Sequence, residues 1–516
     1  MRRKVHPKQQ HLLSTILLLF FMDLWRASGY LTYPYKDYLW KEVGDFMRQI
    51  CLKLILATTC AFTAHAQDTP TDTPPEVLET ISPARSIAKP APFPPLPPNA
   101  IMGQFPIKLE DGASQQHPPD WLAPYLSVRM RGKGTLRAYG FIRGDYAMAS
   151  QRFDDIQIPQ WVLPVDPNFK VGPNKVPIDT DNDFNYNMYP RLTRLGLEYF
   201  HPEFDAWGIP MHVWGRIETD FLVRSTEVSP LNPPSRELMR LRLAYAAFQR
   251  ADWSFVIGQD WDIFSPLLPV VQAGTQMAYA GNLGDRRPCA YVGYDHDFGD
   301  GFRIQIQNGI CLANAIDQSD QGGTGIRDNE DYGLPGYQTR LGFIIPSQAN
   351  ELQPLIFGVG GVMADDDAGA AIGKSGARIY PIRGISADLR FPINEWLSFQ
   401  GEAWTGYNLN DFRGGIGQGI NPIQGKTIQA SGGWGELVGQ PTKWNRFSLG
   451  TGLDKPMGDE VPDGGRTRNL VYWASSQLVL DPGVVIGLEY YYWMTQWKSF
   501  NPGTASLIQL YLQANF

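Results

Sequence analysis

The chain has 516 residues, of which 43% are hydrophobic and 19% charged, and its formal net charge is −7. The mean hydropathy is −0.26 and no run of about 18 apolar residues occurs, which argues against membrane-spanning helices. The acidic excess argues against nucleic acid as a partner. Plentiful glycine (52 residues) and aromatic residues (12%) indicate an all-β protein with many turns.

Residues 1–66 are predicted to be a leader. Residues 47–66 read MRQICLKLILATTCAFTAHA, in which Arg48 and Lys53 precede an apolar stretch and a small-residue end. This is the pattern of a secretory signal peptide, with cleavage expected before Gln67 and a natural start at Met47. The alternative is that residues 12–22 serve as the export signal. Without residues 1–66 the chain has 45 − 9 = 36 basic and 52 − 4 = 48 acidic residues, a net charge of −12.

Residues 67–133 are predicted to be a Pro-rich, extended linker in the periplasm. They include DTPTDTPPEV and KPAPFPPLPPNA, which are too poor in periodic apolar residues to fold alone.

Sixteen strands are predicted after the linker, and many of them alternate apolar and polar residues with a period of two. Their ranges are 135–147, 191–200, 211–222, 239–249, 253–259, 287–297, 301–312, 338–345, 354–363, 381–391, 396–408, 427–437, 444–453, 467–479, 483–496 and 505–516. Connections after even-numbered strands are short, and those after odd-numbered strands are usually long. Short turns on one rim and long loops on the other are typical of outer-membrane β-barrels. We therefore expect residues 134–516 to form a transmembrane antiparallel β-barrel of 16 strands, wide enough for an aqueous channel.

The last strand ends in the aromatic residue Phe516. This end resembles the C-terminal signature that the outer-membrane assembly machinery reads, although Ala514 stands where that signature often has an aromatic residue. The expected location is the outer membrane of a Gram-negative-type bacterium, in contact with lipid and lipopolysaccharide.

Three segments resemble the DcaP-like family of trimeric outer-membrane porins. They are Gly258-Gln259-Asp260-Trp261-Asp262-Ile263-Phe264, Arg191-Leu192-Thr193-Arg194-Leu195-Gly196-Leu197 and Met239-Arg240-Leu241-Arg242-Leu243-Ala244-Tyr245. The resemblance is densest over residues 134–265. It implies a sixteen-stranded homotrimer that passes small solutes, often with a preference for anionic ones. It also implies that the third loop, 260–286, folds inward and narrows the pore.

Arginines recur on the first four predicted strands, where their alternation partners are apolar. An arginine facing lipid at mid-bilayer depth would cost about 2–4 kcal/mol, so these side chains are expected to face the lumen and guide small anions. They are Arg137, Arg143, Arg194, Arg216, Arg240 and Arg242. The alternative is that acids on the same strands neutralise them. Those acids are Asp145, Glu198, Glu218 and Asp220.

Asp260, Asp262 and Asp285 belong to the predicted constriction loop and are expected to face the arginine wall. The alternative is an ordinary external loop. Cys289 and Cys311 flank a hairpin centred near residue 300, so they lie opposite one another on antiparallel strands and are predicted to form a disulfide bond.

No catalytic constellation, metal-spaced cluster or cofactor motif is recognised, so the sequence predicts neither an enzyme nor a cofactor. The leading hypothesis is a passive porin that favours small anions such as carboxylates. The alternatives are an adhesive or structural barrel, a barrel enzyme, and a substrate-specific channel with an aromatic track formed by Tyr139, Phe141 and Trp214.

Overall fold

The computed structural model describes 127–130, 134–171, 176–177, 184–222, 238–272, 276–299, 301–314, 326–347, 353–369, 378–481 and 483–516. The predicted leader, its signal peptide and most of the predicted linker lie outside the described residues.

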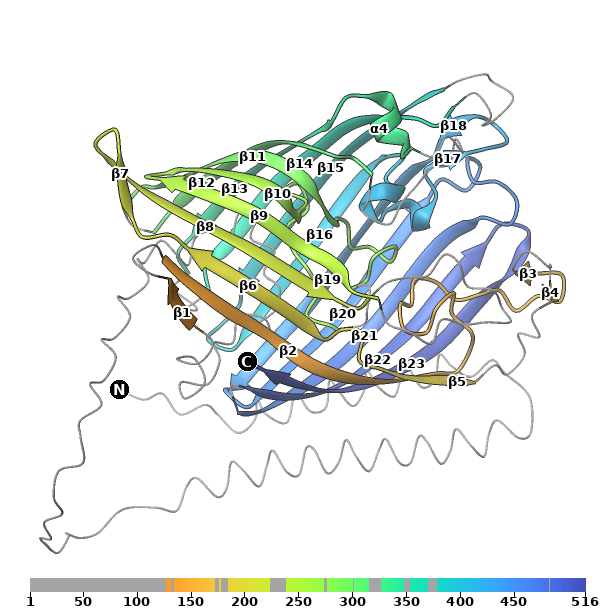
Figure 1. Cartoon of the computed structure of the whole chain (residues 1–516). Coiled ribbons are helices and arrows are strands. Elements are labelled where there is room, and N and C mark those ends of the chain that lie inside the picture. Colours follow the sequence, from red (N-terminus) through yellow and green to blue (C-terminus); the bar gives the residue numbers. More distant parts are fainter. Residues whose placement is uncertain are drawn as a thin grey trace, which may run out of the picture. The chain divides into compact units, whose positions relative to one another are not determined.

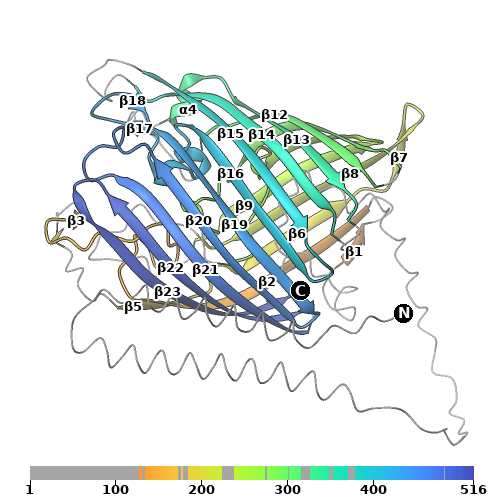
Figure 2. The same cartoon turned by 180° about the vertical axis from the view of Figure 1, so that it is seen from behind.

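Each of the sixteen predicted ranges overlaps one long strand of a single sheet (Figures 1 and 2). These strands are β2 (Gly134–Ala149), β6 (Arg194–Phe200), β8 (Ile209–Asp220), β9 (Arg240–Arg250), β10 (Trp253–Trp261), β11 (Arg286–Asp297), β12 (Arg303–Cys311), β13 (Gly336–Ile345), β14 (Leu355–Asp367), β15 (Ile379–Pro392), β16 (Leu397–Tyr407), β19 (Gln429–Thr442), β20 (Asn445–Pro456), β21 (Arg466–Asp481), β22 (Val484–Trp497) and β23 (Phe500–Asn515). The all-β prediction and the strand number are confirmed.

The sheet closes into a barrel because its first and last long strands pair with each other. Each long strand pairs antiparallel with the next one along the chain, from β2–β6 to β22–β23. β23 then pairs with β2, from Phe141 opposite Asn515 to Ala149 opposite Leu507. Figure 1 shows these two strands, orange and dark blue, side by side. Over the paired halves of β2 and β23, closure removes the open edges that hydrocarbon could not satisfy.

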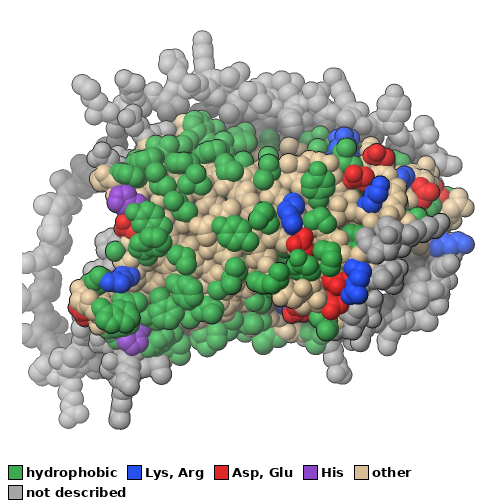
Figure 3. All heavy atoms as spheres, turned by 90° about the horizontal axis from the view of Figure 1, so that it is seen from above, with side chains coloured by type: hydrophobic (Ala, Val, Ile, Leu, Met, Phe, Trp, Pro, Cys, Tyr) green, Lys and Arg blue, Asp and Glu red, His purple; other side chains and the backbone are tan. Residues whose placement is uncertain are grey.

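Alternation along the strands gives the barrel an apolar outer wall and a polar lumen. On β6, Leu195 and Leu197 are 39% and 45% exposed on the outer side, while Glu198 between β2 and β8 is 5% exposed. In Figure 3 apolar side chains cover much of the side wall, and acidic and basic side chains gather toward its ends. This distribution fits a wall that faces lipid.

Among the described residues, no helix has the length and apolar character needed to cross a membrane.

The end of the predicted linker contains a strand that pairs with the barrel, which the sequence did not predict. β1 (Ser127–Met130) lies within 67–133 and pairs with the first half of β2, from Ser127 opposite Arg137 to Met130 opposite Gly134. β23 reaches only the second half of β2, from Phe141 onward. β1 therefore covers a backbone edge that would otherwise be open, a requirement that composition alone did not reveal.

The remaining elements are short and belong to the connections. They are β3 (Lys170–Val171), β4 (Val176–Pro177), β5 (Asn185–Tyr189), β7 (Phe204–Ala206), α4 (Asp328–Tyr332), η2 (Asn410–Phe412), η3 (Gly415–Gly417), β17 (Ile420–Asn421) and β18 (Lys426–Thr427). Short and long connections alternate as expected, except that only Lys498 and Ser499 separate β22 from β23.

Candidate functional site

The connection after β10 folds into the barrel, as predicted for the third loop. Five of its apolar residues are at most 1% exposed although no strand contains them. They are Ile263, Phe264, Leu267, Val270 and Val271. An external loop would leave such side chains in water. The connection after β10 therefore packs inside the lumen.

Three carboxylates on the barrel wall accept hydrogen bonds from the backbone of this loop. Glu402 Oε1 on β16 accepts from Leu267 N at 2.6 Å, and Glu436 Oε1 on β19 accepts from Val270 N at 2.7 Å. Glu489 on β22 accepts from Gln272 N at 3.0 and 3.1 Å. Buried backbone N–H groups need such partners. The three glutamates therefore hold the loop along the wall, a role that the sequence analysis missed.

The loop backbone also runs against glycines of the wall. A Cβ added at Gly360 on β14 would lie 2.1 Å from the carbonyl oxygen of Phe264, and one at Gly452 on β20 would lie 2.1 Å from that of Ala280. Only residues without a side chain permit this approach.

Two further connections meet the constriction loop inside the barrel. Tyr279 N donates to the carbonyl oxygen of Arg413 at 2.9 Å, and Gly284 N donates to that of Phe412 at 2.8 Å. In the connection after β2, Val162 N donates to Thr495 Oγ1 on β22 at 2.9 Å. We call the described parts of 150–165, 262–285 and 408–428 the inner loops; together they narrow the lumen.

All six predicted arginines form ion pairs, and their partners are the four acids that were the alternative explanation. The pairs are Arg137–Glu198, Arg216–Glu198 (2.5 Å), Arg143–Asp145 (2.6 Å), Arg194–Glu218 (3.5 Å), Arg242–Glu218 (2.6 Å), Arg242–Asp220 (3.0 Å) and Arg240–Asp220 (2.8 Å). Six arginines against four carboxylates leave 6 − 4 = 2 positive charges. Pairing reduces the positive charge of this wall and does not cancel it.

The acids of this wall are less accessible than the arginines that pair with them. The side chains of Arg137 and Arg216 are each 27% exposed, whereas that of Glu198 is 7% exposed. Arg240 is 18% exposed and Asp220 is 1% exposed. At these three arginines, the exposed charge of the wall is therefore mainly guanidinium.

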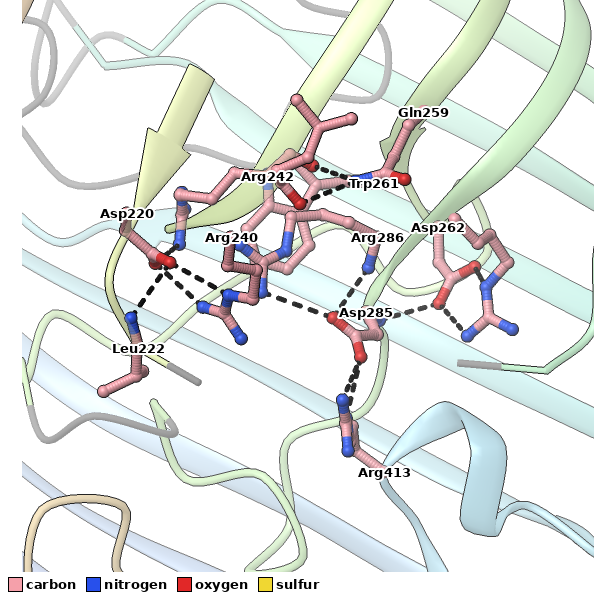
Figure 4. Close-up of polar contacts among 12 residues, drawn as sticks. Asp220, Leu222, Arg240, Arg242, Gln259, Trp261, Asp262, Asp285, Arg286 and Arg413 are labelled. Carbon is pink, nitrogen blue, oxygen red and sulfur yellow. Dashed lines mark hydrogen bonds and ion pairs between the residues drawn. The ribbon is translucent and has the colours of Figure 1, made fainter. Parts of the chain in front are cut away.

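The three predicted loop acids contact groups other than the six arginines. Asp262 Oδ2 accepts from Arg287 Nη2 at 2.9 Å, and Tyr291 Oη donates to Asp260 Oδ2, on β10 itself, at 2.9 Å. Asp285 accepts from Arg413 Nε at 2.8 Å (Figure 4).

Contrary to the expectation from the sequence, these three acids do not face the arginine wall directly. The acids are at most 6% exposed, and a buried carboxylate needs a partner in contact with it. Those partners are not evident from the sequence, because Arg286 and Arg287 begin β11 and Arg413 lies in a distant loop.

Arg286 connects the loop acids to the arginine wall. Its Cζ lies 4.8 Å from the centroid of the Trp261 ring, and that of Arg242 lies 5.9 Å from the same centroid (Figure 4). Arg286 Nη2 approaches Asp285 Oδ1 at 3.5 Å, but its Nε and Nη1 are buried without a hydrogen-bond partner. Arg286 therefore adds a buried positive charge between the loop acids and the arginine wall.

Of the three residues predicted to form an aromatic track, two lie beside arginines and one packs against a buried cluster. The Cζ atoms of Arg216 and Arg194 lie 5.3 and 5.2 Å from the ring centroids of Tyr139 and Phe141. Trp214 packs instead beside a buried cluster that includes Cys289.

Cys289 and Cys311 are joined by a disulfide bond at the opposed positions that the hairpin register predicted. Their Cα atoms are 4.1 Å apart, and the side chains belong to a buried cluster with Ile263 and Tyr291. The bond therefore lies on the lumen side, where the constriction loop leaves β10.

Within the described ranges, no group of three or more His, Cys, Asp or Glu side chains is placed to hold a metal ion.

The sequence matches no family model and no curated protein. Solved structures do resemble the fold. The outer membrane channel DcaP of Acinetobacter baumannii matches with a TM-score of 0.58 and 15% identity, over 75% of this chain and 99% of that chain. An anion-selective porin from Comamonas acidovorans (TM-score 0.43, 10% identity, 74% and 100% covered) and OmpF of Salmonella typhi (0.45, 9%, 76% and 100%) are more distant. The chain therefore has the sixteen-stranded outer-membrane barrel fold of the DcaP channel.

Proposed function

We propose that the chain is an outer-membrane porin through which small hydrophilic solutes diffuse passively, with a preference for small anions such as carboxylates. The proposal rests mainly on the recessed position of the acids in the arginine wall. Arg137 and Arg216 share Glu198, and each remains about four times as exposed as that carboxylate (27% against 7%). A solute entering the inner loops would meet guanidinium groups first.

Arg286 gives this preference a place in the constriction. Its guanidinium group lies beside the Trp261 ring with Nε and Nη1 shielded from the lumen, so its charge would attract a carboxylate at longer range. Arg240 and Arg242 lie on the neighbouring part of the wall (Figure 4) and would add longer-range attraction. Asp220 and Asp285 prevent the site from being strongly positive, which favours release as well as entry.

Several partners belong to the same proposal. The apolar outer wall would contact lipid and lipopolysaccharide, and three copies would assemble as a homotrimer. The end of β23 would be read by the barrel assembly machinery through Phe516. Its backbone N–H and C=O already pair with Gly140 at 3.0 and 3.1 Å, so this residue takes part in closure.

The deciding experiment reconstitutes the mature chain in a planar bilayer and measures conductance and the reversal potential in a salt gradient. We expect conductance steps in groups of three and a reversal potential displaced toward that of the anion. Arg137→Gln and Arg216→Gln should each shift the potential toward that of the cation.

Arg327→Gln is the matched control, because it removes an arginine whose partner, Glu330, lies three residues away outside the barrel strands. An unchanged potential is expected for it. A folded barrel without conductance would favour the second candidate, a structural or adhesive barrel whose lumen is blocked by the inner loops.

A further inference from the structure

Three buried oxygen atoms without hydrogen-bond partners lie near the rim that carries the long loops. They are Oδ1 of Asp366 at the end of β14, and Oδ1 of Asn408 and Asn410 in the connection after β16. Asp366 and Asn408 are 0% exposed and Asn410 is 6% exposed. We call these three residues the rim pocket. A buried oxygen without a hydrogen-bond partner destabilises the fold, so three of them together call for a physical explanation.

The two amide oxygens converge. A Cβ added at Gly419 would lie 1.9 Å from Asn410 Oδ1 and 2.0 Å from Asn408 Oδ1. The two oxygens are therefore at most 1.9 + 2.0 = 3.9 Å apart, and glycine at position 419 gives them room.

Hydrogen bonds fix the orientation of both amides. Asn408 Nδ2 donates to Asp366 Oδ2 at 2.9 Å, and Asn410 Nδ2 donates to Asp411 Oδ1 at 3.0 Å. Rotating either amide by half a turn would place its oxygen against a carboxylate oxygen. The nitrogens therefore face the acids and the oxygens face the pocket.

The surroundings of the rim pocket are acidic. The carboxylates of Asp411 and Asp328 act electrostatically on Asp366. The acids on either side of Asp366 in the sequence are paired, Asp365 with Arg383 and Asp367 with Arg378. Asn314 Nδ2 donates to Asp411 Oδ2 at 2.5 Å, and the guanidinium groups of Arg287 and Arg413 also act electrostatically on Asp411.

We propose that the rim pocket binds a hard divalent cation, calcium, through Asp366 Oδ1, Asn408 Oδ1 and Asn410 Oδ1. Carboxylate and amide oxygens are ligands that calcium accepts, and water can complete its six to eight positions. A cation there would satisfy all three oxygens and offset the surrounding negative charge. With a single carboxylate in the group, affinity is expected in the range of extracellular calcium modules, about 0.1–1 mM.

The bound ion would join the rim to the constriction. Asp366 belongs to the barrel wall, whereas Asn408 and Asn410 lie five and three residues before Arg413, which bonds to Asp285 in the constriction loop. Calcium would therefore fix the inner loop 408–428 to β14.

The test is a calcium titration of the purified full barrel in detergent, by calorimetry and by thermal unfolding, after treatment with chelator. We expect saturable binding of one ion per chain in the stated range and a higher unfolding temperature than in potassium chloride of equal ionic strength. Magnesium should bind more weakly, because it tolerates irregular oxygen geometry poorly. The absence of saturable calcium binding would overturn the proposal.

Two substitutions in the rim pocket and one control beside it test where the ion binds. Asp366→Asn keeps the side-chain shape and should lower calcium affinity at least tenfold. Asp365→Asn is the matched control, since it removes the adjacent carboxylate that is paired with Arg383, and it should leave binding unchanged. Asn410→Asp adds a carboxylate to the pocket and should tighten binding. Equal affinity in the wild type, Asp366→Asn and Asn410→Asp would place the ion elsewhere and refute the assignment.

Discussion

Arg413, in the connection after β16, donates through Nε and Nη2 to a single carboxylate oxygen of Asp285, at the end of the connection after β10. The two residues are 128 positions apart in the sequence. Arg413 is 9% exposed and Asp285 is 4% exposed. Through this pair one inner loop fixes the position of another.

Replacing Arg413 by Gln should loosen the constriction. Asp285 would keep the hydrogen bond from the backbone N of Arg286 (2.8 Å) and the longer contact with its guanidinium group (3.5 Å). Breaking a buried pair from one side typically costs about 3–5 kcal/mol. We expect a lower unfolding temperature, with larger and noisier single-channel conductance. Arg378→Gln, which breaks a pair whose arginine is 59% exposed, should change neither measurement. Equal effects of the two variants would contradict the role assigned to Arg413.

The same pair should make the constriction sensitive to acid only at low pH. Burial by itself would raise the pKa of Asp285, but the guanidinium groups of Arg413 and Arg286 hold it well below its usual range. A depressed folded-state pKa stabilises the fold above the unfolded value of about 3.9, and this contribution is lost as pH falls below it. The Arg413–Asp285 pair should therefore stay intact from neutral pH down to about pH 4 and alter single-channel conductance only below that range, whereas Asp411, whose pKa burial raises to about 6, titrates within it. A change of conductance between pH 6 and 5 would show that another group controls the opening.

Gly360→Ala should displace the constriction loop from β14, because the added methyl group would lie 2.1 Å from the Phe264 carbonyl oxygen. Gly361→Ala is the control on the adjacent residue, where the nearest atom would be 3.6 Å away. We expect faster proteolysis of the purified barrel within residues 262–285 and altered conductance for Gly360→Ala alone. Identical digestion patterns for the two variants would argue against the close packing described here.

Glu198→Gln should increase anion selectivity. The substitution removes the carboxylate that Arg137 and Arg216 share, so the net charge of the arginine wall rises by one while both guanidinium groups remain. The reversal potential in a salt gradient should move further toward that of the anion. Glu330→Gln makes the same charge change in α4 and should leave the potential as it is. A shift toward the cation in Glu198→Gln would reject a selectivity set by these arginines.

The disulfide bond should resist reductant in the folded barrel and yield to it after unfolding, because Cys289 and Cys311 are 5% and 2% exposed. The double variant Cys289→Ser, Cys311→Ser should be less stable by roughly 3 kcal/mol in the chain-entropy account of a loop of this length. Gel mobility with and without reductant and counting of alkylatable thiols measure both expectations. Two reactive thiols in the native, untreated protein would exclude the bond.

The barrel could be predicted from the sequence because its signals are local. Leu195 and Leu197 alternate with polar neighbours, and short turns such as Ala251–Asp252 alternate with long loops. The pairing of Cys289 with Cys311 followed from the same register arithmetic, since a hairpin centre fixes which residues face each other. The number of strands came from these patterns, as did the lumen-facing side of the strands that carry the six arginines and the two cysteines.

The interior of the barrel could not be predicted in the same way. Glu402, Glu436 and Glu489 bind a loop that is more than a hundred residues away in the sequence, and no periodicity marks them as different from other lumen residues. Pairing of the arginines with acids on the same strands was only one of two alternatives. A sequence does not show that the Glu198 side chain is less exposed than that of Arg216.

The position of β2 also bears on how the molecule is made. The second half of β2 pairs with β23. Residues near 145 therefore cannot complete the ring until residues near 510 are present. Before β23 pairs with β2, a partly assembled sheet has two open edges with free N–H and C=O groups. A prematurely terminated chain would lack β23 altogether, and we expect periplasmic chaperones to hold it and proteases to remove it.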